Sequence, residues 1–210
     1  MDIDNYKYEK ELIKNGINFI AGVDEVGRGP LVGPVVAACV VLPLNYKLDG
    51  LTDSKKLSEK KREKFFDIIK EDALGIGIGI IDNKKIDEVN IYEATKLAMK
   101  EAIKNCKKEC NIEHVLIDAM PLDIDIPTTS IIKGDLKSLT ISAASVIAKV
   151  TRDRMLIELD KKYPMYDFIH NKGYPTKKHI EAIDKYGILN EHRKSYGPVA
   201  KYLEKNSMSK

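Results

Sequence analysis

Four carboxylates stand where apolar segments of the chain end. Asp24 and Glu25 close a run that begins near Ile17, and a Gly-Arg-Gly turn follows them at once. Asp118 ends a second apolar run, and Asp135 comes shortly after a third. The ends of neighbouring strands meet at one crevice of an open sheet, so we expect these acids to lie close together. Carboxylates gathered without histidine or cysteine favour Mg²⁺ or Mn²⁺ over zinc, which predicts a site for those ions.

The chemistry of such a site is phosphoryl transfer. Two ions about 4 Å apart would clamp the attacking and leaving oxygens of an in-line displacement. One geometric condition applies, because neighbouring residues of a strand point to opposite faces. Asp24 and Glu25 can share a site only if the strand already turns at Glu25, and Gly27 makes such a turn feasible. A strand that ends in a solvated acidic turn explains this stretch, taken alone, equally well.

Two other kinds of site are weaker interpretations. Cys106, Cys110 and His114 follow one another at four-residue steps, but the predicted change from helix to strand would turn them to different faces. We therefore expect these cysteines to be small buried hydrophobic residues. The glycines after Glu25 do not fit the G-x-G-x-x-G pattern of a nucleotide-binding turn, since the last comes one residue late and Pro30 stands where the helix should begin.

The elements that must position the acids follow from apolar periodicity. Strands are expected at about 17–24, 35–41, 76–80, 115–118 and 128–132. Helices are expected within 1–16, after an N-cap at Ser58, from a cap at Asn90 to Cys110, from Leu139 to about Lys161, from a cap at Thr176 to near Gly187 and between Pro198 and Lys205. The short link between the first two strands predicts an antiparallel hairpin. This order predicts an α/β fold with a five-stranded mixed sheet flanked by helices, in one domain over 1–210 whose residues from about 163 to 210 form a helical extension.

Composition places the protein among ordinary globular chains. Of 210 residues, 43% are hydrophobic and 32% are charged, which argues against disorder. The formal net charge of +3 permits nucleic-acid binding without requiring it. No apolar run reaches the length of a membrane span, and the polar start does not match a signal peptide. Three cysteines do not suggest a disulfide framework, so we expect a cytoplasmic protein without a membrane partner.

Seven segments resemble bacterial ribonuclease HII and occur in the order of that family. They span about Phe19 to Val199 and are Asp-Glu-Val-Gly-Arg-Gly-Pro, Asp-Ser-Lys-Lys-Leu-Ser, Leu-Ile-Asp, Lys-Gly-Asp, Ser-Ala-Ala-Ser-Val-Ile-Ala-Lys-Val-Thr-Arg-Asp-Arg, His-Asn-Lys-Gly-Tyr-Pro-Thr and His-Arg-Lys-Ser-Tyr-Gly-Pro-Val. The ordered set is highly specific. The resemblance implies a ribonuclease H-like fold and a metal-dependent endonuclease. Such enzymes cut RNA in RNA–DNA hybrids and cut 5′ of single ribonucleotides embedded in duplex DNA, leaving 3′-hydroxyl and 5′-phosphate ends, which implies a role in ribonucleotide removal during DNA repair and replication.

The resemblance also assigns catalytic residues. The four acids of the family match Asp24, Glu25, Asp118 and Asp135, which would be the metal ligands. Asp153 is the competing fourth acid, because it stands in the conspicuous Thr-Arg-Asp-Arg segment. The fourth acid of the family follows Lys-Gly, which selects Asp135. We expect Asp153, well inside a helix and flanked by arginines, to form an ion pair instead.

Substrate recognition must sense a lone 2′-hydroxyl, the group that separates the sugar of RNA from that of DNA. Backbone groups of a glycine turn can approach closely enough to bond it, which fits the implied role of the Gly-Arg-Gly turn. Tyr174 matches the family tyrosine that stacks on the sugar at the RNA–DNA junction, and a lysine pair just before a helix suits phosphate contacts. A surface tyrosine and an exposed basic pair are the alternatives. The predicted substrate-binding residues are Gly27, Arg28, Gly29, Lys55, Lys56 and Tyr174.

Two departures from the family and two alternative functions bear on these expectations. Ala119 follows Asp118 where bacterial members usually carry glycine. The tail after Val199 lacks a glutamine-led aromatic clamp-binding motif, so we expect neither recruitment by a sliding clamp nor an obligate protein partner. Ribonuclease HIII resembles the family but carries Gly-Lys-Gly in the turn and an additional N-terminal domain, whereas this chain has Arg28 and a short leader. A hybrid-binding module without catalysis would require the loss of an acid, and all four acids are present.

Overall fold

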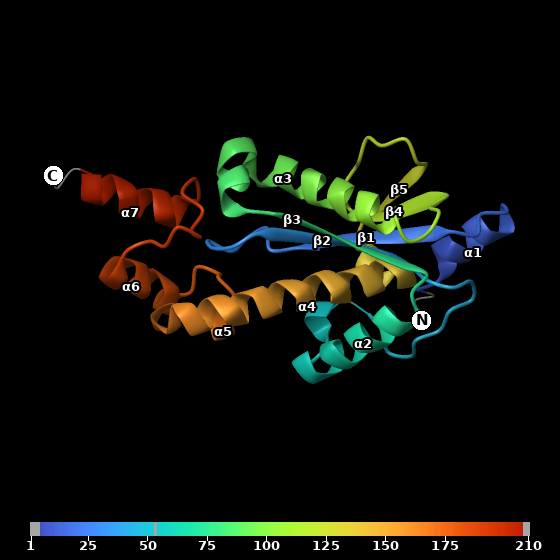
Figure 1. Ribbon diagram of the computed structural model, residues 1–210, viewed down its shortest axis with the longest axis horizontal. Coiled ribbons are helices and arrows are strands. Elements are labelled where there is room, and N and C mark those ends of the chain that lie inside the picture. Colours follow the sequence, from blue (N-terminus) through green and yellow to red (C-terminus); the bar gives the residue numbers. More distant parts are fainter. Residues whose placement is uncertain (1–4, 53, 208–210) are drawn as a thin grey trace.

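A five-stranded sheet with the strand order β3-β2-β1-β4-β5 forms the centre of the computed structural model, which describes residues 5–52 and 54–207 (Figure 1). The strands are β1 (Ile20–Val26), β2 (Val35–Val41), β3 (Gly75–Ile81), β4 (His114–Asp118) and β5 (Thr128–Ile131). β1 pairs antiparallel with β2 and β2 with β3, whereas β4 runs parallel to both β1 and β5. The predicted hairpin and the predicted mixed α/β sheet are confirmed.

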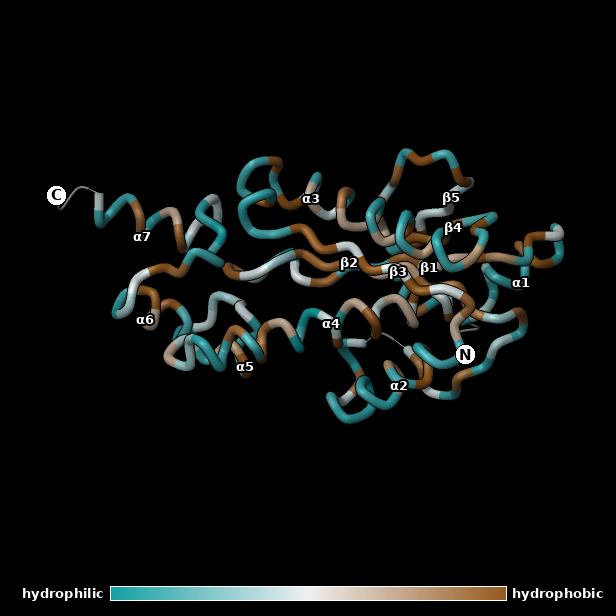
Figure 2. Tube along the Cα trace, in the orientation of Figure 1, coloured by the Kyte–Doolittle hydropathy of each residue, from teal (hydrophilic) through white to brown (hydrophobic). Residues whose placement is uncertain are grey.

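Helices cover both faces of this sheet. α3 (Asn83–Cys106) lies on one face, and α4 (Leu139–Lys162) lies on the other with α2 (Glu59–Asp72) outside it (Figure 1). The remaining helices and 3₁₀ turns are α1 (Lys7–Lys14), η1 (Ser54–Lys56), η2 (Gly134–Leu136), η3 (Pro164–Tyr166), α5 (Phe168–Asn171), α6 (Lys177–Tyr186) and α7 (Gly197–Ser207). Figure 2 shows hydrophobic residues concentrated in the central strands, as expected for a sheet buried on both faces.

Alternation along β1 divides its residues between the two faces. Ala21 and Val23 pack into the core beneath α3. On the opposite face, Gly22 lies so close to the first turn of α4 that a Cβ would come 2.1 Å from the Thr140 carbonyl carbon. A larger residue would push α4 away from the strand that carries Asp24. Close packing of helix on strand therefore determines where this acid lies.

β1 continues to Val26, beyond the predicted end of the strand at Asp24. Glu25 pairs with Ala37 of β2 in the antiparallel ladder. The expectation that the strand turns at Glu25 is therefore wrong, because the ladder keeps its backbone extended, yet Glu25 still lies close enough to Asp24 for its charge to act on that acid. The turn begins only at Gly27, whose φ is 93°.

α3 begins at Asn83 rather than at Asn90. The predicted cap nevertheless exists, since the Asn90 side chain accepts hydrogen bonds from the N–H groups of Tyr92, at 2.9 Å, and Glu93, at 3.1 Å. Asn90 has a φ of 69°, which produces a kink between two helical segments. The sequence pattern at Asn90 predicted only the second helical segment. The first segment begins at a separate cap, Asp82.

The chain after α4 is helical, as predicted, although the single turn of α5 was not predicted. η3 and α5 to α7 gather at one end of the molecule (Figure 1). Their apolar side chains pack around Leu31 and Val32 in the loop that follows β1. The extension therefore braces the loop that contains the Gly-Arg-Gly turn. Residues 1–4 of the expected first helix and 208–210 of the tail lie outside the described residues, none of whose helices is long and apolar enough to cross a membrane.

Candidate active site

Asp24 and Asp118 lie at the ends of two adjacent parallel strands. The register of β1 against β4 makes the two acids the next residues after the last paired positions. Asp24 is 6% exposed and accepts hydrogen bonds from the Glu25 N–H, at 2.7 Å, and from the Ser145 hydroxyl of α4. Burial raises the pKa of Asp24 well above its usual value, and the charges of Glu25 and Asp118 raise it further. The three carboxylates form one electrostatic group.

Glu25 has both acids and cations beside it. Burial raises the pKa of the Glu25 carboxyl, Arg28 and Lys55 oppose that shift, and Asp118 adds to it. The Arg28 guanidinium lies 3.6 Å from a Glu25 carboxylate oxygen, and 44% of the Arg28 side chain is exposed. An ion pair this open to water contributes at most about 1 kcal/mol, so a stronger ligand can displace it.

A tight turn brings Asp135 toward the same strand ends. The Gly134 N–H donates to a carboxylate oxygen of Asp118 at 2.7 Å, and a Cβ at Gly134 would come 3.3 Å from that oxygen and 2.6 Å from the Ile141 side chain. The next residue, Asp135, is buried, and its carbonyl accepts the Ser142 hydroxyl of α4 at 2.7 Å. Strand β4 and helix α4 together fix the turn that carries the fourth predicted acid.

The acids have the chemistry of a site for a hard divalent cation. Their donors are carboxylate oxygens, and the charge on Asp24 is disfavoured by its neighbours until a cation compensates it. As the described side chains are placed, they form no group of three or more histidine, cysteine or carboxylate ligands. A bound cation would therefore have to draw these carboxylates closer together.

The glycine turn and the predicted tyrosine make one surface. At Gly27 a Cβ would come 2.3 Å from the Arg152 Nε and 2.9 Å from the Pro34 carbonyl oxygen, so no other residue fits. At Gly29 a Cβ would come 3.1 Å from the ring of Tyr174. This ring therefore lies over Gly29, and 46% of the tyrosine is exposed. The two predicted recognition elements are thus brought together from distant parts of the chain.

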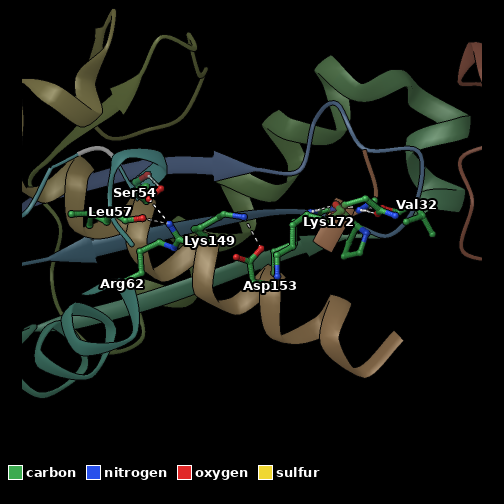
Figure 3. A network of polar contacts seen from close by, with 12 residues as sticks. Val32, Ser54, Leu57, Arg62, Lys149, Asp153 and Lys172 are labelled. Atoms are coloured by element: carbon green, nitrogen blue, oxygen red, sulfur yellow. Dashed lines mark hydrogen bonds and ion pairs between the residues drawn. The ribbon is translucent and has the colours of Figure 1, made fainter. Parts of the chain in front are cut away.

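The 3₁₀ turn η1 presents the two predicted lysines. Arg62 donates to the Ser54 carbonyl at 3.0 Å, and the hydroxyls of Ser54 and Ser145 are 2.8 Å apart, which ties η1 to α2 and α4 (Figure 3). Lys55 lies close enough to the acids to act on the pKa of Glu25. Lys56 is exposed on the same turn. The structure therefore brings Lys55 to the acids, with Lys56 exposed next to it on the same turn.

Comparison with known proteins decides the family. The model of a family described as Ribonuclease HII matches residues 21–198. The chain belongs to the ribonuclease HII family. It is a ribonuclease H, an endonuclease, as the sequence analysis predicted. Ribonuclease HII of Bacillus mycoides (strain KBAB4) is 59% identical over 199 residues, which are 95% of this chain and 77% of that protein. Ribonuclease HII of Bacillus cereus (strain B4264) is 58% identical over the same shares.

Solved structures share the fold of this ribonuclease HII family member. Ribonuclease H2 from Pyrococcus horikoshii OT3 matches with a TM-score of 0.74 and 27% identity, over 89% of this chain and 98% of that chain. The structure of the PCNA:RNase HII complex from Archaeoglobus fulgidus matches with a TM-score of 0.71 and 25% identity, over 85% and 95%. Bst-RNase HIII in complex with Mn²⁺ is 17% identical at a TM-score of 0.68, over 91% and 71%, and shows the fold alone. The ribonuclease H-like fold is confirmed.

Helix α4 contributes polar side chains that the sequence motifs did not reveal. Ser142, Ser145, Lys149 and Arg152 are spaced by three or four residues, so they share one face of the helix. This spacing is visible in the sequence as a polar stripe and could have revealed them. Lys149 also forms a 2.6 Å ion pair with Asp153 (Figure 3). The ion pair expected at Asp153 therefore exists, but its partner is Lys149 and not a flanking arginine.

Arg152 joins two loops of the site. Its guanidinium donates to the carbonyl oxygens of Val32, at 3.1 Å, and Lys172, at 3.2 Å (Figure 3). The first lies in the loop of the Gly-Arg-Gly turn, and the second lies two residues before Tyr174. Backbone acceptors leave no residue pattern in a sequence, so this role could be found only in the fold.

Proposed function

We propose that this protein cleaves the RNA strand of RNA–DNA hybrids and also cuts 5′ of single ribonucleotides embedded in duplex DNA. Its products would carry 3′-hydroxyl and 5′-phosphate ends, and its role would be ribonucleotide removal in DNA repair and replication. The observation that carries the proposal is continuity along one short segment. Asp24 and Glu25 belong to the acid group, and Gly27 to Gly29 begin two residues later beside the ring of Tyr174. The acids that carry out the reaction and the turn that recognises the sugar would thus keep fixed positions relative to each other.

We further propose that two Mg²⁺ or Mn²⁺ ions bind to Asp24, Glu25, Asp118 and Asp135. The mutual repulsion of the first three carboxylates supports this assignment, because a divalent cation would relieve it. The chemistry that such ions supply when bound is charge stabilisation of the attacking and leaving oxygens of an in-line displacement. The residues themselves orient the site: Ser145 holds Asp24, and the Gly134 N–H holds Asp118.

Recognition would be shared between the glycine turn, Tyr174 and the two lysines of η1. The exposed ring of Tyr174 can stack on a sugar, and its phenol can bond a 2′-hydroxyl. Arg28 is half exposed and can exchange its ion pair with Glu25 for a phosphate. Lys55 and Lys56 would bind phosphates without reading the sugar.

Cleavage of an end-labelled DNA duplex that contains one ribonucleotide tests the proposed function. The reaction is run with EDTA, with Mg²⁺ and with Mn²⁺, beside an all-DNA duplex and an RNA–DNA hybrid. We expect a single cut 5′ of the ribonucleotide in either metal, no cut in EDTA and no cut of all-DNA. Duplex binding without cleavage in both metals would overturn the proposal in favour of a hybrid-binding module, and a cut at any other position would overturn the assigned specificity.

A further inference from the structure

Arg193 is a fully buried cation that binds the backbone of the Gly-Arg-Gly turn. It is 0% exposed. Its guanidinium donates to the carbonyl oxygens of Gly27 at 2.6 Å, Arg28 at 2.9 Å and Gly33 at 3.0 Å. One side chain therefore holds both ends of the loop that follows β1. These contacts span more than 150 residues of sequence, so they are a feature of the fold and not of local propensity.

Tyr196 completes this arrangement. Its hydroxyl accepts a hydrogen bond from Arg193 at 3.0 Å and donates to the Arg28 carbonyl at 2.5 Å. The Tyr196 ring lies over the Arg193 guanidinium, 5.0 Å from its centre. The backbone of the same segment contributes as well, since the Arg193 N–H donates to Leu31 at 2.8 Å. The Arg28 carbonyl thus has two donors, and its direction is fixed.

The direction of these carbonyls determines the direction of two N–H groups. The described peptide bonds are trans, and in a trans peptide the N–H points opposite to the carbonyl of the preceding residue. The Gly27 and Arg28 carbonyls point toward Arg193, so the N–H groups of Arg28 and Gly29 point away from it. Arg28 and Gly29 lie outside the helices and strands. Within the described residues, neither of their N–H groups donates to another backbone group. Arg28 and Gly29 are both exposed.

We propose that Arg193, together with Tyr196, is a positioning residue that fixes the Arg28 and Gly29 N–H groups as an outward-facing donor pair for a substrate hydroxyl or phosphate oxygen. Neither side chain touches substrate; both act through the backbone of the turn. Arginine suits this role because its planar guanidinium carries five donors in fixed directions, whereas lysine has one rotating ammonium group. The inference rests on the proposed function, since it explains how the turn would be ready for a ribonucleotide before binding.

The test compares Tyr196→Phe and Arg193→Lys with a matched control, Tyr46→Phe. Tyr46 is also half-buried, and its hydroxyl donates to Asp72 at 2.7 Å, away from the turn. Cleavage is measured on a one-ribonucleotide duplex and on a long RNA–DNA hybrid, and the ¹⁵N–¹H resonances of Arg28 and Gly29 are recorded without substrate. A merely structural role would lower cleavage of both substrates by the same factor.

We expect Tyr196→Phe to lose about tenfold in kcat/KM on the one-ribonucleotide duplex, and less on the hybrid, because one hydrogen bond to the turn is lost. Its two amide resonances should shift, and Tyr46→Phe should match the wild type throughout. Arg193→Lys should lose more of its kcat/KM on that duplex. If this variant does not fold, Tyr196→Phe alone tests the inference. Unchanged resonances together with an unchanged ratio between substrates would overturn the inference. If the wild type itself does not cleave, the proposed function fails, while the amide resonances still decide whether the pair is fixed.

Discussion

Two neighbouring regions of this protein bury charge in opposite ways. At the strand ends, Asp24 lies beside the carboxylates of Glu25 and Asp118, and burial with like charge raises the pKa of Asp24. Around the loop that follows, Arg152 of α4 and Arg193, which precedes α7, are buried cations that donate to backbone carbonyls of the loop. The first region concentrates charge that a ligand can compensate. The second uses its charge internally to hold a backbone shape.

The difference shows how a site can be reactive and rigid within one short segment. A buried group of like charges costs stability until a counter-ion binds, so it favours a cation. A fully hydrogen-bonded buried network is rigid and specifies one conformation. We infer that the acids are arranged for binding and reaction, whereas the arginine-braced turn is arranged for recognition. Substitutions in the two regions should therefore differ in kind.

The largest effect is expected at the acids. Asp24→Asn and Asp118→Asn should each lower cleavage by at least about a thousandfold while folding and duplex binding remain, because a ligand is lost and the amide keeps the shape. Asp135→Asn should be milder and partly rescued by raised metal. The control is Asp153→Asn, which breaks the ion pair to Lys149 outside the acid group. Equal loss at Asp153 and none at Asp135 would show that the fourth acid was assigned wrongly.

A pair of buried histidines makes the second region sensitive to acid. The His179 Nδ1 lies 2.9 Å from the Tyr174 carbonyl, and the His192 Nδ1 accepts the Leu189 N–H at 2.9 Å. The Nε2 atoms are 3.1 Å apart, so His192 must donate to His179 with both rings neutral. A proton added to the unprotonated nitrogen of either ring would place two N–H donors face to face. Burial, and then the charge of His179, lowers the pKa of His192 to about 4.

The contribution of the histidine pair to stability should therefore fall as the pH decreases from about 6.5 to about 4, whereas the raised pKa values of Asp24 and Glu25 act in the opposite direction. In this window the unfolded chain binds a proton at His192 that the folded chain does not, and the free energy of unfolding should fall by up to about 3 kcal/mol. Urea unfolding at a series of pH values measures the slope. His192→Gln should flatten it, whereas His170→Gln, at an exposed histidine, should not. A slope that His192→Gln leaves unchanged would exclude the pair as its source.

Tyr174→Ala separates recognition from reaction. Loss of stacking on the sugar costs about 1–3 kcal/mol, so cleavage of a one-ribonucleotide duplex should fall by roughly ten- to a hundredfold. A long hybrid offers many registers and should lose less. Tyr186→Ala is the matched control, because Tyr186 is exposed to a similar degree, 50% against 46%. If both substrates lose the same factor at Tyr174, the tyrosine does not read the junction and its loop is only structural.

Lys55→Ala should produce the smallest effect, a reduction of a few-fold in affinity that is equal for both substrates. A phosphate contact carries no sugar specificity. Its loss should reduce the number of counter-ions released on binding, which the salt dependence of the affinity measures, by about one. Binding is measured at two salt concentrations with Lys56→Ala beside it. An effect confined to the one-ribonucleotide duplex would contradict a phosphate role.

Local patterns predicted much of the fold. β2 matches its predicted bounds of 35–41, because seven consecutive apolar residues buried on both faces leave no other interpretation. Ser58 and Thr176 cap their helices as predicted, each through its side-chain oxygen. The start of α3 was missed because Asn90 has the composition of a first cap but lies inside a kinked helix. Errors therefore fall where one local signal is compatible with two arrangements.

The site was predicted less completely. The acids and the Gly-Arg-Gly turn were visible because their residue types and order are specific. The role of Arg193 was not, because its guanidinium donates to the Gly27 carbonyl 166 residues away and a carbonyl belongs to every residue type. Ala119 was noted as a departure from glycine, and its φ of 47° shows that the turn does require a left-handed residue there. The sequence predicts the chemistry, and only the fold shows how these residues are held in place.

We infer that repulsion among the strand-end acids lowers the stability of the protein until a divalent cation removes it. Thermal melting of the wild type and Asp24→Asn, in EDTA and in Mn²⁺, tests it directly. Asparagine keeps an acceptor for Ser145 but removes the charge. We predict that Asp24→Asn melts about 2–4 °C above the wild type in EDTA, a change of about 1 kcal/mol, and that Mn²⁺ raises the melting temperature of the wild type only. A variant that melts below the wild type in EDTA, or a wild type that Mn²⁺ does not stabilise, would contradict the account.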